Sequence, residues 1–150
     1  YPLIVNAGFK GKGLRFQEKG ELIINLTDFI FDEDNFSIEF YFKPESILKS
    51  IYRVNDLVVF ENIQNNVKDS FAIQIDKNFK IISSNFISDN VFSKEGEWNY
   101  FSILKEGENL KYNLNDVEIA NFTYIKRINR IRFKPNYMTL DEIRIKKMIF

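Results

Sequence analysis

The stretch Phe36-Ser37-Ile38-Glu39-Phe40-Tyr41-Phe42-Lys43-Pro44 decides the fold class, because large apolar side chains alternate along it with polar ones. Successive side chains of a β-strand point to opposite faces of the sheet, so the Phe and Ile residues would share one face. The residues between them would share the other face and meet solvent. The pattern predicts a strand that is packed on one side only, and Pro44 is expected to end its pairing.

The same period of two recurs at short intervals along the chain and predicts an all-β fold, a two-sheet antiparallel jelly-roll sandwich. Asn115-Asp116 lies between two such runs and tolerates the positive φ angles of a two-residue hairpin. Two stretches depart from the rhythm: residues 44–55 predict a short helical turn, and Gly8–Gly13 predicts a mobile entry loop. The further predicted strands are Leu14–Gln17, Leu22–Leu26, Leu57–Ile63, Ser70–Asp76, Phe79–Ser83, Trp98–Lys105, Asn109–Leu114, Val117–Asn121, Asn129–Lys134 and Asp141–Lys147.

The composition restricts the classes of function. The chain has 150 residues, 45% of them hydrophobic, which predicts a single domain over residues 1–150. Equal numbers of basic and acidic residues, 21 of each, argue against a nucleic-acid partner. No apolar run is long enough for a membrane span. The sequence contains no Cys and no His, so thiolate and imidazole chemistry are excluded. Carboxylate chemistry, oxygen-ligated metals and plain binding remain.

Several segments, in their order along the chain, resemble the laminin-G-like branch of the concanavalin A-like lectin/glucanase superfamily. They are Gly13–Phe16, Glu21–Ile24, Phe36–Lys43, Gly96–Phe101, Leu110–Asn115 and Leu140–Ile145. The resemblance implies two curved antiparallel sheets whose concave face or loops bind glycans or proteins. Some relatives are glucanases that carry a Glu-x-Asp-x-x-Glu strand motif. That spacing is absent here, so no enzyme is expected unless two acids from different strands converge in a cleft.

Exposed tyrosines and nearby polar groups form the predicted ligand site, since the C–H face of a sugar packs on an aromatic ring. Glu39 and Tyr41 share the polar face of the 36–44 strand, Tyr52 lies in the irregular stretch, and Asn136 and Tyr137 lie in a turn. Three more aromatic residues are weighed as stacking groups: Trp98, Tyr100 and Tyr112. Trp98 is favoured as a core residue.

The leading hypothesis is a non-catalytic carbohydrate-binding module of a larger extracytoplasmic protein, and the carbohydrate ligand rests on the resemblance and on the exposed tyrosines. The chain opens with Tyr1-Pro2 rather than Met, which indicates a domain of a longer protein or a mature secreted product. Other domains of a longer parent chain are expected. The alternative is a structural or protein–protein module of a cell-envelope or adhesin-like assembly, which the apolar residues of the 47–52 stretch would serve.

Asp141 is the carboxylate that stands out, because it has the same parity as Ile143 and Ile145 and is expected to point inward. Two interpretations stay open. Asp141 accepts backbone N–H bonds at the strand end, or it binds a structural Ca²⁺ of the kind that the resemblance implies.

Basic residues concentrate in the last third of the chain and are expected to face outward. They bind an anionic glycan or another acidic surface, or they pair with Glu39, Glu118 or Glu142 on neighbouring strands. The candidate basic patch consists of Arg130, Arg132, Lys134, Arg144 and Lys146.

Overall fold

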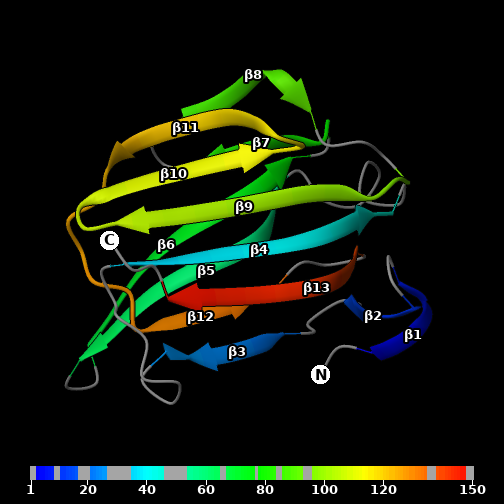
Figure 1. The fold of residues 1–150 in the computed structure, drawn as a ribbon, viewed down its shortest axis with the longest axis horizontal. Helices are drawn as coiled ribbons and strands as arrows, with labels where there is room; N and C mark the ends of the chain where they lie inside the picture. The colour runs from blue at the N-terminus through cyan, green and yellow to red at the C-terminus, as the bar shows by residue number, and fades with distance from the viewer. Residues whose placement is uncertain are drawn as a thin grey trace.

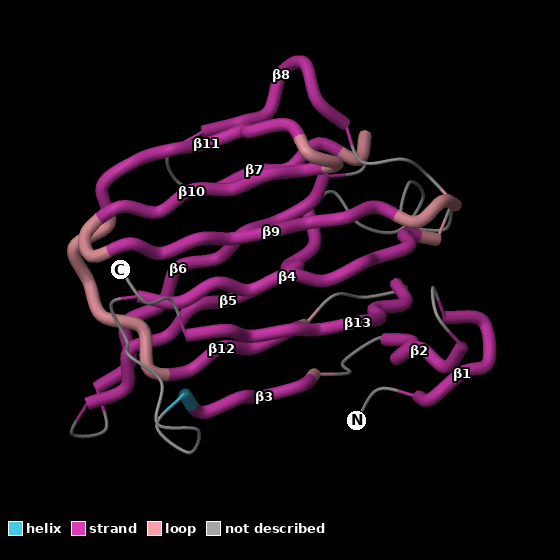
Figure 2. The backbone as a smooth tube through the Cα atoms, in the orientation of Figure 1, coloured by secondary structure: helices cyan, strands magenta, loops and turns pink. Residues whose placement is uncertain are grey.

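The computed structural model describes residues 3–8, 11–16, 21–26, 35–45, 54–64, 67–76, 78–83, 86–92, 96–134 and 138–147. Strands dominate these residues (Figure 2), and the only helical residue among them is Leu26, in a 3₁₀ turn after β3. No described helix is therefore long and apolar enough to cross a membrane. Most of the stretch predicted as a helical turn, residues 46–53, lies outside the described part of the chain.

The strands lie in two antiparallel sheets that pack face to face (Figure 1), which confirms the predicted sandwich. Within the described ranges one sheet has seven strands, in the order β1-β2-β13-β4-β9-β10-β11, and the other has six, in the order β3-β12-β5-β6-β7-β8. The strand bounds are β1 Leu3–Gly8, β2 Gly11–Phe16, β3 Leu22–Asn25, β4 Asn35–Pro44, β5 Val54–Gln64, β6 Val67–Asp76, β7 Lys80–Ser83, β8 Phe86–Phe92, β9 Asn99–Glu106, β10 Asn109–Leu114, β11 Val117–Thr123, β12 Arg130–Phe133 and β13 Met138–Lys147.

Most predicted strands are confirmed, but β1 and β8 were not predicted. Among the described strands both lie at a sheet edge, and each pairs with a single neighbour. Their sequences, LIVNAG and FISDNVF, lack a clean apolar alternation. The prediction of a loop over Gly8–Gly13 was wrong over Gly11–Gly13, because β2 begins at Gly11 and its register pairs Gly8 with Gly11 in a hairpin.

The alternation of β4 holds along its whole length, with buried and half-buried residues in strict succession. Phe40 is fully buried and contacts Phe133 of β12 edge to face, with ring centroids 5.3 Å apart. It also packs against Phe42 and Phe101 of its own sheet. Because Phe133 belongs to the other sheet, this cluster joins the two layers at the centre of the core.

A hairpin turn joins β10 to β11, and a backbone hydrogen bond is made at the end of β4. Asn115 and Asp116 both have positive φ, 50° and 66°, as predicted for the hairpin between β10 and β11. Pro44 is the last residue of β4, and its carbonyl accepts a hydrogen bond from the Gly96 backbone N–H. The predicted end of the 36–44 strand at Pro44 is therefore confirmed for β4.

Truncation of the central aromatic residue tests this account of the core. We expect Phe40→Ala to lower the free energy of unfolding by about 3–5 kcal/mol, because it removes contacts to both sheets and leaves a cavity. Urea denaturation measures the change. Val117→Ala is the control, since Val117 is 47% exposed, and it should cost less than about 1 kcal/mol. Equal effects of the two changes would contradict the assignment.

Candidate ligand-binding site

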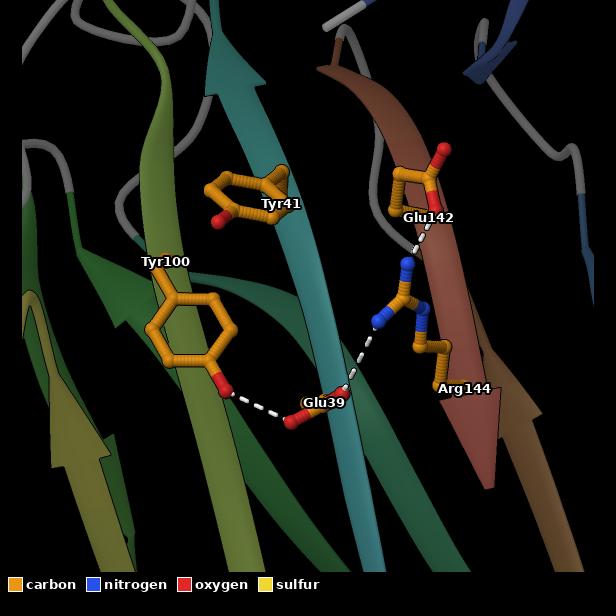
Figure 3. A pocket seen from close by; sticks show the side chains of 5 residues that line it. All are labelled: Glu39, Tyr41, Tyr100, Glu142 and Arg144. Atoms are coloured by element: carbon orange, nitrogen blue, oxygen red, sulfur yellow. Dashed lines mark hydrogen bonds and ion pairs between the residues drawn. The ribbon is translucent and has the colours of Figure 1, made fainter. Parts of the chain in front are cut away.

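The outer face of the seven-stranded sheet carries a hollow of about 150 Å³ where β4 lies between β9 and β13 (Figure 3). The inward residues of β4 fill the core, so the residues between them project from this outer face. Three strands thus supply the lining, which consists of Glu39, Tyr41, Tyr100, Glu142 and Arg144.

Two tyrosines form the aromatic side of the hollow. Tyr41 of β4 lies directly opposite Tyr100 of β9 in the sheet register, and their ring centroids are 5.0 Å apart at an interplanar angle of 42°. The side chain of Asn115 accepts a hydrogen bond from the Tyr100 backbone N–H, and the Asn115 N–H donates to the Tyr100 carbonyl. The hairpin turn therefore fixes the backbone beneath one of the two rings.

Glu39 is the polar centre of the hollow, because groups from both neighbouring strands reach it. The Tyr100 hydroxyl donates to Glu39 Oε2 at 2.6 Å, and Lys146 Nζ lies 3.2 Å from Glu39 Oε1. Arg144 Nη1 lies 3.8 Å from the same Oε1 atom. The hydrogen bond from Tyr100 is the largest cause that lowers the pKa of Glu39, and Lys146 and Arg144 lower it further, against an opposing contribution from burial. Glu39 is therefore ionised at neutral pH.

The Tyr100 phenol responds in the opposite sense. Burial is the larger cause that raises its pKa, and the hydrogen bond and charge of Glu39 raise it further. The phenol therefore remains a hydrogen-bond donor at neutral pH and keeps the carboxylate oriented.

A β-bulge in β13 brings Glu142 into the hollow. Asp141 lies opposite Tyr41 and Arg144 lies opposite Glu39, so three steps along β13 match two steps along β4. Glu142 sits inside the bulge with φ of 52°, in the left-handed region. Arg144 Nη2 donates to Glu142 Oε2 at 3.0 Å, so the guanidinium lies between the two carboxylates. The predicted cross-strand pairing with Glu39 is confirmed for Arg144 and Lys146, whereas Glu142 pairs with Arg144 within β13 itself.

The same bulge overturns the predicted direction of Asp141. Leu140 lies opposite Phe42 and is buried, so Asp141, opposite Tyr41, belongs to the outer face. The expectation that it points inward with Ile143 was wrong, because one extra residue reverses the parity along the strand. Asp141 Oδ1 accepts a hydrogen bond from the Glu142 backbone N–H. No group of three or more acidic side chains that could hold a metal ion occurs in the described ranges, and a Ca²⁺ at Asp141 stays a prediction.

Of the residues predicted to bind a ligand, the structure brings Glu39 and Tyr41 together in the hollow. Tyr52, Asn136 and Tyr137 lie outside the described part of the chain. Among the additional aromatic candidates, Tyr112 is fully buried in the core and cannot stack on a ligand. Trp98, favoured as a core residue, is half-buried.

Tyr100 was weighed as a stacking group but was not included in the predicted ligand site, and Glu142 was considered only as a partner of the basic residues. The argument that selected Tyr41 would also have selected Tyr100, because Phe101 faces inward and its neighbour must face outward. Glu142 gave no such signal for a place in the hollow, since its position depends on a bulge that local alternation does not predict.

The predicted basic patch is divided between the two sheets. Arg144 and Lys146 lie on β13 of the seven-stranded sheet, whereas Arg130 and Arg132 lie on β12 of the six-stranded sheet, with Lys134 just after it. Because the outer faces of the two sheets point away from each other, these residues do not form one surface.

The two arginines of β12 are held by a carboxylate of β5. The side chain of Glu61 is fully buried, and its two oxygens accept from Arg130 Nε at 2.7 Å and from Arg132 Nη2 at 2.9 Å. Arg132 Nη1 also lies 3.6 Å from Glu21. The predicted partner of these arginines was wrong, since Glu61 had not been considered.

Comparisons with known proteins agree on the fold. No protein-family model matches the chain, and no curated protein matches its sequence. Trypanosoma rangeli sialidase, solved in complex with sialic acid, matches with a TM-score of 0.74 at 9% identity, over 98% of this chain and 27% of the sialidase. The binding domain of botulinum neurotoxin serotype G matches with a TM-score of 0.64 at 16% identity, over 99% of this chain and 42% of that domain.

A third solved structure is closer in size. Domain 4 of AbnA, a GH43 extracellular arabinanase from Geobacillus stearothermophilus in complex with arabinotriose, matches with a TM-score of 0.64 at 12% identity. The match covers 98% of this chain and 75% of that domain, whereas the chain spans less than half of the sialidase and of the toxin domain. Together these matches show a shared β-sandwich fold.

The hydrogen bond from Tyr100 gives Glu39 a measurable pH signature. Because the folded pKa of Glu39 lies below its ordinary value of 4.5, its contribution to stability is present above that pH and is lost as pH falls through the folded pKa. We expect Tyr100→Phe to move the pKa of Glu39 upward, toward that ordinary value. Carboxyl NMR titration of both proteins measures the shift, and an unchanged pKa would show that the hydrogen bond is not its main cause.

Removal of the buried charge beneath the β12 arginines tests the second cluster. We expect Glu61→Gln to lower the free energy of unfolding by about 3 kcal/mol, because it breaks two charge-assisted hydrogen bonds. The matched control is Glu118→Gln, since Glu118 is half exposed and lies 4.0 Å from Lys111. This control should cost less than about 1 kcal/mol. Urea denaturation compares the two, and similar costs would refute a structural role for Glu61.

Proposed function

We propose that the chain is a non-catalytic carbohydrate-binding module and that the hollow on the outer face of its seven-stranded sheet holds the sugar. The observation that carries the proposal is the pairing of two adjacent tyrosine rings with an ionised carboxylate, Glu39, on one side of a rigid sheet. Saccharides need both kinds of group, since their C–H faces pack on rings and their hydroxyls donate to charged oxygens.

The arrangement of the strands suits recognition without a large rearrangement. Tyr41, Tyr100 and Glu39 stand on two hydrogen-bonded neighbouring strands, and Asn115 holds the backbone of Tyr100. Side chains fixed in this way lose little further conformational freedom when a ligand arrives. The entropic cost of binding a small ligand such as an oligosaccharide is therefore lower.

The structural relatives support a binding role. The arabinanase domain, of which the chain covers 75%, is described in complex with arabinotriose, and two of the other matches are neurotoxin binding domains. From the sequence resemblance, we extend the proposal to a laminin-G-like module that belongs to a larger extracytoplasmic protein. The extracellular arabinanase supports that location.

The chemistry of the hollow favours binding over hydrolysis. Glu39 and Glu142 come from different strands and converge in the hollow, and such a pair of carboxylates is what a glycosidase would require. The Arg144 guanidinium, however, lies between the two carboxylates and contacts both. A general acid must be protonated near neutral pH, and the lowered pKa of Glu39 removes it from that role.

The alternative of a structural or protein–protein module rests on the apolar residues of the 47–52 stretch. That stretch lies outside the described part of the chain. The glycan screen below separates the two functions, since a purely structural module would bind no saccharide.

Removal of the outer ring tests the proposal. We expect Tyr41→Ala to weaken saccharide binding about tenfold, because it removes one stacking surface, while Tyr41→Phe retains most of the affinity. A glycan array identifies the ligand, and isothermal titration calorimetry measures the affinities. Ile125→Ala is the control, since Ile125 is 73% exposed and is not among the residues that line the hollow. This variant should bind saccharide as tightly as the unsubstituted protein. Failure of the unsubstituted protein to bind any glycan on the array would overturn the proposal.

A further inference from the structure

We infer that the hollow selects a neutral saccharide and discriminates against acidic ones. The inference rests on the proposed function and adds the chemical class of the ligand. It follows from the way in which the charged groups of the hollow are already matched to one another.

The first step concerns the two cations that reach the hollow. Arg144 directs Nη1 toward Glu39 at 3.8 Å and Nη2 toward Glu142 at 3.0 Å, and Lys146 lies 3.2 Å from Glu39. Two carboxylates thus face two cations, and both terminal nitrogens of the guanidinium are directed at protein carboxylates (Figure 3). A sugar carboxylate or sulfate needs an Arg fork that is available for two parallel hydrogen bonds. An anion at Arg144 would therefore have to compete with two protein carboxylates for the guanidinium.

The second step concerns the negative charge that an acidic sugar would meet. Glu39 is held in its ionised form by Tyr100, Lys146 and Arg144, and its side chain is only 21% exposed. An anionic ligand in the same hollow would approach this carboxylate at short range, where a like charge is unfavourable. The repulsion is screened less than it would be on an open surface.

The third step concerns what a neutral sugar gains. An ionised carboxylate offers about four acceptor sites, and the groups seen around Glu39 and Glu142 leave some of them to a ligand. Sugar hydroxyls are donors that can fill such sites, and the Tyr41 and Tyr100 rings supply the apolar surface. Donors without charge therefore fit this hollow best.

Pairs of ligands that differ only in charge test the inference. Sialyllactose and trigalacturonate are each compared with their methyl esters by calorimetry, at low and at high salt, alongside neutral arabinotriose. We expect arabinotriose and the methyl esters to bind with little dependence on salt. At least one ester should bind about tenfold more tightly than the corresponding free acid. Equal or tighter binding of the acids overturns the inference and leaves the proposed function standing. Binding of no saccharide on the wider array overturns both.

A charge substitution on the bulge tests the cause. We expect Glu142→Gln to increase affinity for the free acids about tenfold, because it releases one nitrogen of Arg144 from its carboxylate and leaves one net positive charge. Glu118→Gln makes the same change of charge on β11 and should leave the ratio of acid to ester affinity unchanged.

A second variant guards against misfolding of the first. Glycine is suited to the positive φ at this position, so Glu142→Gly removes the same carboxylate without backbone strain. Circular dichroism confirms that each variant is folded. An unchanged preference in a folded Glu142 variant would overturn charge matching as the source of selectivity.

Discussion

The edge-to-face contact between Phe40 and Phe133 is the interaction on which the rest of the structure depends. It joins β4 of one sheet to β12 of the other at the centre of the core. Because side chains alternate along a strand, the burial of Phe40 obliges Glu39 and Tyr41 to face outward. The packing that holds the sandwich together therefore also determines which side chains of β4 form the outer face.

The hollow depends on a second constraint, the bulge in β13. Without the extra residue, strict pairing would leave Glu142 no place beside Arg144 and Glu39. The bulge places an acidic residue at positive φ next to a guanidinium, and this pairing neutralises a strand that looks basic in sequence. Charge at this surface is thus governed by backbone geometry as well as by composition.

Local patterns predicted what local physics controls. The alternation around Phe40 gave the strand, its buried face and the outward positions of Glu39 and Tyr41. The turn chemistry of Asn115-Asp116 gave the hairpin. These features depend on neighbours in sequence, so a single sequence was enough to predict them.

The features that were missed depend on pairing between distant segments. Asp141 was given the wrong face because parity is reset by register against β4, about a hundred residues earlier in the chain. The partnership of Glu61 with Arg130 joins positions 69 residues apart, and no periodicity in either strand indicates it. The edge strands β1 and β8 were missed because their sequences lack the regular apolar alternation on which the prediction relied.

Glu39 has one more consequence for the molecule. Its carboxylate accepts from β9 on one side and contacts β13 on the other, so a single side chain cross-links three adjacent strands above the plane of the sheet. Folding has therefore already immobilised the groups that an incoming sugar would meet. The remaining entropic cost falls on the glycosidic torsions of the ligand itself, and a short, stiff oligosaccharide would lose the least on arrival.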